Sequence, residues 1–106
     1  MPMHPLLEEI NSKMIRSGEL LIRYLVLRGE CSDLTLDKRT QEYIANLHDS
    51  LETYADTVGF LTNQLTGKPD NNDMVQLLRI NAEYDAYIKA LKSGVFQLSY
   101  IINRNS

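Results

Sequence analysis

Residues 74–102 read MVQLLRINAEYDAYIKALKSGVFQLSYII, and this stretch decides the fold. Apolar side chains recur in it at alternating steps of three and four residues, and Asn81 is the one polar member of the series. The members are Met74, Leu77, Asn81, Tyr84, Ile88, Leu91, Val95, Leu98 and Ile102. Because this spacing puts about one side chain per turn on the same face, it predicts a helix over residues 73–103 that packs lengthwise against another helix.

The same spacing occurs earlier in the chain, at Ile44, Leu47, Leu51, Tyr54, Val58, Leu61 and Leu65. It predicts a helix over residues 37–66, which is expected to end where Gly67 and Pro69 stop it. A turn over residues 67–72 is too short to carry the chain back to the other end, so the two helices must pack antiparallel. The sequence therefore predicts a long, coiled-coil-like helical hairpin.

Another helix is predicted over residues 5–28, ahead of the hairpin. Pro5 suits a first helical position, and Gly29 fits a C-terminal stop that opens a polar linker over residues 29–36. The apolar stripe of this helix comprises Leu7, Ile10, Met14, Leu21 and Leu25. The expected fold class is all-α, a single domain spanning the whole chain in which an N-terminal helix joins the hairpin, as a three-helix bundle or as part of an oligomeric bundle.

The first and last helices both carry more apolar side chains than one hairpin seam can cover. Residues 20–27 are apolar on nearly every side of the first helix. We expect such side chains to form a protein interface, in a homo-oligomer or with a partner helix. The predicted interface residues are Leu20, Leu21, Tyr24, Leu25, Leu27, Leu78, Tyr87, Phe96, Tyr100 and Ile101. The alternative is a compact three-helix bundle that exposes a few ordinary apolar residues.

Asn81 can be interpreted in two ways. A buried amide costs stability, and it is tolerated where it fixes the register or the oligomeric state of packed helices. In the other interpretation the side chain simply reaches solvent at the edge of the hairpin.

Composition and charge argue against several classes of function. The net charge is −3, the pI is about 5.3 and the basic residues are scattered, which argues against nucleic acid as a partner. The longest apolar stretch, residues 20–27, is far shorter than the roughly 20 residues that span a bilayer, so no membrane span is expected. The first residues lack the pattern of a secretory signal. We expect a cytoplasmic protein, with export that uses no cleaved signal as the open alternative.

The sequence offers little for catalysis or cofactor binding. His4, His48 and Cys31 are the only histidines and the only cysteine, and no nucleophile, base or set of metal ligands is spaced around them. We expect His48 to be a surface or boundary residue. Cys31 is expected to be an unreactive loop residue, because Glu30 and Asp33 disfavour its thiolate. No enzyme activity, metal or cofactor is predicted.

The C-terminal part of the chain resembles a known family. The stretches GKPDNNDM (67–74), AEYDAYIKA (82–90) and YIINRNS (100–106) are similar to needle and inner-rod subunits of bacterial type III secretion systems. Those subunits are small helical hairpins with a Tyr-x-x-Tyr pair, which Tyr84 and Tyr87 match here. The resemblance implies helical polymerisation through hairpin faces, with packing positions at Tyr84, Tyr87, Leu91, Val95 and Ile102. The apolar first helix departs from those shorter subunits.

A second similarity involves Leu25-Val-Leu-Arg-Gly, a polar linker and Leu47-His-Asp-Ser-Leu-Glu-Thr. This order resembles small helical connector proteins that adjust bacterial signalling and biofilm regulation, although the linker is longer here. Our first hypothesis is therefore a non-enzymatic adaptor or regulatory protein that acts through self-association or by binding a partner helix. The alternative hypothesis is a structural assembly subunit of the secretion-needle type.

Overall fold

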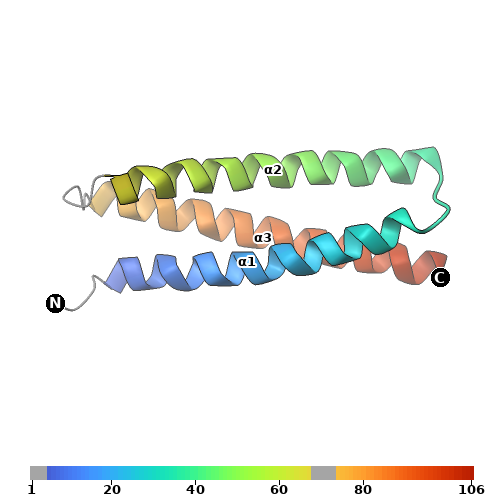
Figure 1. The fold of residues 1–106 in the computed structure, drawn as a ribbon, viewed down its shortest axis with the longest axis horizontal. Coiled ribbons are helices and arrows are strands. Elements are labelled where there is room, and N and C mark those ends of the chain that lie inside the picture. The colour runs from blue at the N-terminus through green and yellow to red at the C-terminus, as the bar shows by residue number, and fades with distance from the viewer. Residues whose placement is uncertain (1–4, 68–73) are drawn as a thin grey trace.

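The computed structural model describes residues 5–67 and 74–106, which form three helices. These are α1 (Pro5–Ser32), α2 (Lys38–Gly67) and α3 (Met74–Asn105). They lie along one long axis, with α1 and α3 running in the same direction and α2 in the opposite one (Figure 1). The radius of gyration is 16.5 Å, against about 13 Å for a compact chain of similar length. The all-α prediction is confirmed, and the molecule is a three-helix rod.

Helix α3 is the central helix, because both α1 and α2 pack against it. Its buried residues form two adjacent series, one of them part of the predicted seam and the other not predicted. The first series is Leu77, Tyr84, Leu91 and Leu98, and the second is Ile80, Tyr87 and Gly94. A helix that buries two adjacent series has two neighbours rather than one. The close packing of α1 on α3 therefore adds a second helix pair to the predicted α2–α3 hairpin.

The predicted seam of α2 is confirmed for the side chains that the structure describes. Leu51, Val58 and Leu61 are buried, and Ile44, Leu47 and Tyr54 pack against the core. Asp37 caps the helix, since its Oδ1 accepts a hydrogen bond of 2.7 Å from the backbone N–H of Thr40. Hydrogen bonding from the Thr40 side chain, and then from its backbone N–H, lowers the pKa of the Asp37 carboxyl. The side chain of Leu65 and the predicted turn and caps at residues 68–73 lie outside the described residues.

The predicted end of the first helix is wrong, because α1 continues past Gly29 to Ser32. A glycine that stops a helix usually adopts positive φ, and no described glycine does so. The helix ends instead where Asp33 and Leu34 donate backbone hydrogen bonds to the carbonyls of Glu30 and Cys31, at 3.2 and 3.1 Å. Cys31 is therefore a buried helix residue of the core, and the prediction of a loop position for it is wrong.

The inner face of α1 also differs from the predicted stripe. It carries Ile10, Ser17, Tyr24 and Cys31, which are spaced seven residues apart. Lys13 lies on the same side, and its Nζ is 2.8 Å from Asp85 Oδ1 of α3. Burial alone would lower the pKa of Lys13, but Asp85 and then Glu9 raise it above its ordinary value. Polar residues are tolerated on this face because they are paired. Since this face, and not the predicted stripe, packs on α3, Met14 and Leu25 of the stripe are exposed.

Gly94 allows α1 and α2 to approach the same point of α3. A Cβ at this position would lie 3.3 Å from Leu51 Cδ1 and 3.4 Å from Tyr24 Cδ2. Tyr24 is completely buried and Leu51 nearly so. The absent side chain of Gly94 therefore provides the space into which one side chain from each neighbouring helix packs.

We predict opposite effects for substitutions at two glycines. Gly94→Leu should lower the free energy of unfolding by about 1–3 kcal/mol, because the added atoms overpack the core. Gly59→Ala should raise it by up to about 1 kcal/mol, because alanine favours the helix and a Cβ at this position meets no atom within 4 Å. Urea denaturation followed by circular dichroism measures both. Equal effects at the two positions would contradict the packing described for Gly94.

Candidate protein-interaction surface

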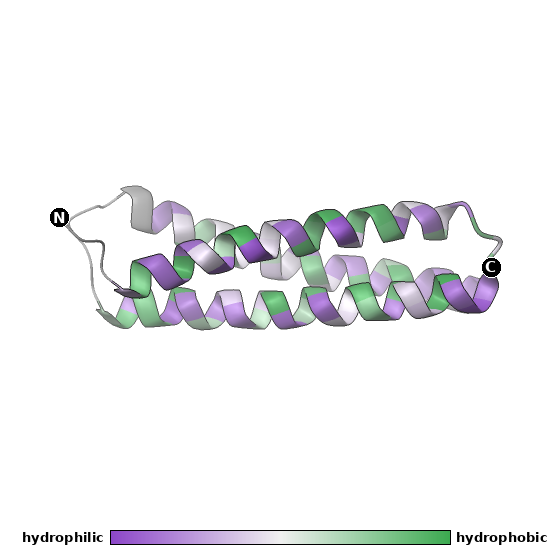
Figure 2. Ribbon diagram, turned by 90° about the horizontal axis from the view of Figure 1, so that it is seen from below, coloured by the Kyte–Doolittle hydropathy of each residue, from purple (hydrophilic) through white to green (hydrophobic). Residues whose placement is uncertain are grey.

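Helix α1 carries a stripe of exposed apolar side chains on the side opposite its inner face. Ile15 and Ile22 are each 66% exposed and Val26 is 58% exposed. Their spacing of seven and then four residues keeps them on one face. We call these three residues the α1 stripe. Leu25 and Met14 are exposed beside it, and Figure 2 shows that the half of α1 toward the linker is largely hydrophobic.

A groove of about 190 Å³ lies next to this stripe, between α1 and α2. Tyr84 and Tyr87 of α3 line it together with residues of both flanking helices. The lining residues of α1 are Met14, Ser17, Gly18 and Leu21, and those of α2 are Ala55, Val58 and Gly59. A Cβ added at Gly18 or Gly59 would meet no atom within 4 Å. The groove is therefore apolar and wide at its small residues, and its shape suits the side chains of another helix.

A second exposed apolar face lies on α3. Val75, Leu78, Phe96 and Tyr100 are 72%, 53%, 68% and 54% exposed. At about 100° per residue they lie on the opposite side of the helix from its buried series. We call these four residues the α3 outer face. None of these four residues lines the groove, so the face is separate from it. Tyr100 also lines a pocket together with Arg39, Thr40 and Tyr43 of α2.

The ten predicted interface residues divide into three groups. Leu20 and Tyr24 of α1 and Tyr87 of α3 are buried in the core of the single chain. Their assignment to an intermolecular interface is therefore corrected, because these side chains pack against the chain's own helices. Leu21, Leu27 and Ile101 are half-buried against that core. Leu25, Leu78, Phe96 and Tyr100 are exposed. The structure thus brings only part of the predicted set to the surface.

The α1 stripe was missed among the predicted interface residues. A signal for it existed in the seven-residue repeat of Ile10, Ser17, Tyr24 and Cys31. Because this repeat marks the inner face, Ile15 and Ile22 must lie on the outer one. A search for large apolar residues misses this repeat, because two of its four members are a serine and a cysteine.

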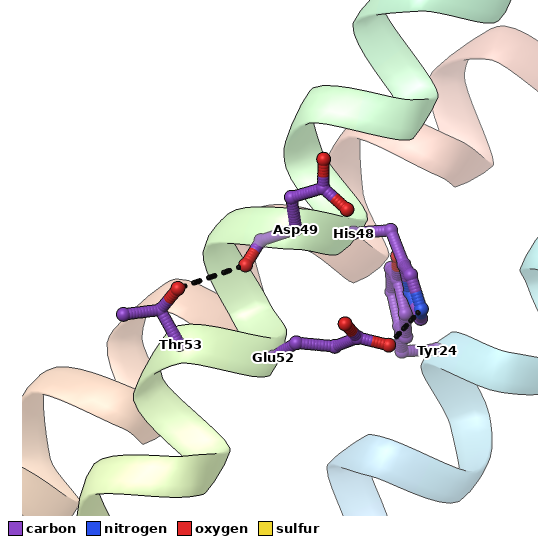
Figure 3. A network of polar contacts seen from close by, with 5 residues as sticks. All are labelled: Tyr24, His48, Asp49, Glu52 and Thr53. Carbon is purple, nitrogen blue, oxygen red and sulfur yellow. Dashed lines mark hydrogen bonds and ion pairs between the residues drawn. The ribbon is translucent and has the colours of Figure 1, made fainter.

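A polar contact joins α1 to α2 at the end of the groove nearer the linker. His48 Nδ1 lies 3.2 Å from the Tyr24 hydroxyl oxygen, and His48 Nε2 lies 2.8 Å from Glu52 Oε1 (Figure 3). The two rings also stack, with their planes 7° apart. In the tautomer that carries its proton on Nε2, His48 donates a hydrogen bond to Glu52, and Nδ1 accepts a hydrogen bond from the Tyr24 hydroxyl. We call these three residues the Tyr24–His48–Glu52 clasp.

A hydroxyl, an imidazole and a carboxylate in contact, as in the clasp, are the groups of a catalytic triad, but the hydroxyl of the clasp is not accessible to a substrate. Tyr24 has no exposed surface, and burial raises the pKa of its hydroxyl. A substrate therefore cannot reach the Tyr24 oxygen without displacing α1. Within residues 5–67 and 74–106, no group of three or more His, Cys, Asp or Glu side chains is placed to hold a metal ion. The clasp is positioned to hold α1 and α2 together, and His48 is a boundary residue as predicted.

Asn81 is half-buried in α3, and its Oδ1 is inside the bundle with no hydrogen-bond donor among the described groups. This placement agrees with the interpretation of a buried amide. An unsatisfied buried acceptor costs about 1–3 kcal/mol. The residue therefore lowers the stability of the single chain.

We predict that Asn81→Leu raises the free energy of unfolding by about 1 kcal/mol, because it removes the unpaired acceptor and keeps the branching of the side chain at Cγ. Asn46→Leu, at an exposed position of α2, is the control and should change stability by less than about 0.5 kcal/mol. Urea denaturation of the three proteins measures this. A loss of stability in Asn81→Leu would show that the amide is satisfied in solution.

We further predict a loss of stability at alkaline pH. Burial, and then Glu30, raises the pKa of the Cys31 thiol above its ordinary value of 9.0. A folded-state pKa above the unfolded one gives a contribution that is complete below pH 9.0 and is lost as the pH rises through the folded value. Burial likewise raises the pKa values of Tyr24 and Tyr87 above 10.0, so these tyrosines add to the loss at higher pH.

The comparison variant for this prediction is Cys31→Ala, whose free energy of unfolding should fall less than that of the parent as the pH rises from about 8.5 to 10. Urea denaturation at several pH values gives both curves. Parallel curves for the two proteins would contradict the burial of the thiol.

No protein-family model, no curated protein and no solved structure matches this chain. The similarity to secretion needle and inner-rod subunits therefore stays a prediction. Among the described residues, no helix combines the length and the apolar character needed to cross a bilayer.

Proposed function

We propose that this protein is a non-enzymatic helical adaptor that works by accepting a helix in the groove between α1 and α2. The observation that carries the proposal is the continuity of the groove with the α1 stripe, since Met14 lines the groove and is exposed beside Ile15. An apolar groove lined by small residues, next to protruding apolar side chains, is the usual form of a helix-binding site. The cytoplasm is the proposed location, as expected from the sequence.

The construction of the site supports binding rather than chemistry. The floor of the groove is held by the core through Tyr84, whose hydroxyl lies 2.9 Å from Thr62 Oγ1 of α2. The clasp and the common packing of both helices on α3 hold the two walls in place. A preformed groove binds a helix at a smaller entropic cost than one that must open.

The alternative function is a structural assembly subunit, and one observation favours it. The α1 stripe and the α3 outer face are two separate apolar surfaces on one rod. If one surface of each molecule bound the other surface of the next, the contact would be heterologous and growth would be open-ended. The C-terminal similarity to needle subunits agrees with this alternative.

A photoreactive amino acid in the groove tests the adaptor function. The position is Gly59, where a new side chain meets open space, and the control position is Asn46, which is exposed on the other side of the same helix. Irradiation of host cells should yield covalent adducts from position 59 and none, or different ones, from position 46. Mass spectrometry identifies the adduct.

The results separate the two functions. An adduct that joins position 59 to a helical segment, of this chain or of another protein, supports the adaptor. If position 59 gives no adducts, and a probe at Phe96 gives a ladder of cross-linked oligomers of this chain, the assembly subunit replaces the adaptor.

A further inference from the structure

We infer that the pocket between the start of α2 and the end of α3 binds an acidic peptide segment that carries a large apolar side chain. This pocket, called the α2–α3 pocket below, lies at the end of the rod where the C-terminus is found (Figure 1). It shares no lining residue with the groove between α1 and α2. The inference goes beyond the proposed function, because it gives the rod a second binding site for a partner of different chemistry.

The α2–α3 pocket has a volume of about 290 Å³ and is formed by side chains of two helices. Tyr43 and Tyr100 border it and are 45% and 54% exposed. The full lining comprises Arg39, Thr40 and Tyr43 of α2 and Gln97, Tyr100 and Ile101 of α3. Tyrosine and arginine are the residues that contribute most to binding energy at protein interfaces, where an apolar side chain of the partner fills a pocket. The concave shape suits a protruding side chain, which a flat lipid surface does not offer.

Two arginines beside the α2–α3 pocket have no carboxylate partner. Arg39 lines it from α2, and Arg104 Nη1 donates a hydrogen bond of 3.0 Å to the Tyr100 hydroxyl oxygen. Among the described residues, no ion pair joins either arginine to an Asp or Glu side chain. Thr40 and, after it, Arg39 lower the pKa of the Asp37 carboxyl, but this carboxylate already accepts the hydrogen bond that caps α2. Each guanidinium therefore keeps N–H donors for a carboxylate of a partner.

The charge on α3 near the pocket is positive although the chain as a whole is acidic. The net charge of the chain is −3, yet residues 86–106 contain Lys89, Lys92 and Arg104 and no Asp or Glu. Both lysines are exposed on the same half of the helix as Phe96. On α2, Glu42 is exposed but does not line the pocket. The partner that this local charge attracts is anionic.

Among anionic partners, an acidic peptide fits best. A few cations match the carboxylates of a short segment, whereas nucleic acid needs a larger positive surface. In the bound state one apolar side chain of the peptide fills the space between Tyr43 and Tyr100. Carboxylates on either side of it pair with Arg39 and Arg104. An apolar anchor in a pocket with charged pairs around it is the usual arrangement of a specific interface.

A library of random peptides displayed on phage and selected on the immobilised full chain tests the site. The enriched peptides should combine Asp or Glu with Leu, Phe or Trp. The most enriched peptide, made with a fluorescent label, gives a dissociation constant by fluorescence anisotropy. Arg39→Glu and Arg104→Glu should each raise this constant about tenfold, because each places a like charge beside the peptide. Tyr43→Ala should raise it by a similar factor, because it removes one wall of the pocket.

Arg79→Glu is the matched control for the charge variants. Arg79 is exposed on the same helix, and the rise per residue places it about 37 Å from Arg104 along the helix axis. The substitution changes the net charge as Arg104→Glu does, but it should leave the dissociation constant unchanged. Circular dichroism confirms equal helix content in all variants.

Four outcomes would overturn the inference. They are the enrichment of no peptide, the enrichment of peptides without acidic residues, equal weakening by Arg79→Glu and Arg104→Glu, and binding that Arg39→Glu and Tyr43→Ala do not change. Vesicles of phosphatidylcholine and phosphatidylserine provide the remaining arm. If they bind the parent but not Arg39→Glu, and no acidic peptide is enriched, an anionic lipid surface replaces the peptide.

These outcomes are separable from the test of the adaptor function. A chain that binds the acidic peptide but gives no adduct from position 59 would keep the α2–α3 pocket as a site and refute the use of the groove. A chain that gives adducts from position 59 but enriches no acidic peptide would leave the adaptor standing and remove the second site.

Discussion

The structure depends on the double packing of α3. This helix has no side chain at Gly94, so that Tyr24 of α1 and Leu51 of α2 both pack over this point. Because α1 and α2 both follow α3, their positions relative to each other are set indirectly. Long side chains of α1 and α2 fill part of the space between these two helices. The part lined by small residues such as Gly18 and Gly59 stays open as the groove.

Polar contacts fix how the three helices are aligned along the rod. Among the described residues, a polar contact joins each pair: Lys13 to Asp85 between α1 and α3, Thr62 to Tyr84 between α2 and α3, and the clasp between α1 and α2. Apolar packing alone tolerates a shift of one helix by a heptad, because leucines repeat at that interval. Each polar pair would be broken by such a shift and would leave a partly buried group without its partner.

The sequence predicted those parts of the fold that rest on large apolar residues at regular spacing. The seams of α2 and α3 are of this kind, and their antiparallel direction followed from the short connection. The inner face of α1 could not be predicted in the same way, because it includes Lys13 and Ser17, which are paired with Asp85 and with the carbonyl of Met14. The four-residue spacing of His48 and Glu52 is visible in the sequence, but their contact with Tyr24 is not, since Tyr24 and His48 are 24 residues apart. For the candidate site, counting apolar residues indicated an excess but could not say which side each one faces.

That excess has a structural cause once the inner face of α1 is known. The helix packs on α3 through a face that is narrow and partly polar, so much of its apolar surface is left for another contact. If exposed isoleucines served no contact, substitution by polar residues would cost the single chain nothing and would improve its solubility. The stripe instead continues into a groove whose glycines weaken two helices by about 1 kcal/mol each relative to alanine. Both features lower the stability or solubility of the isolated chain, and both are explained if a helix covers them.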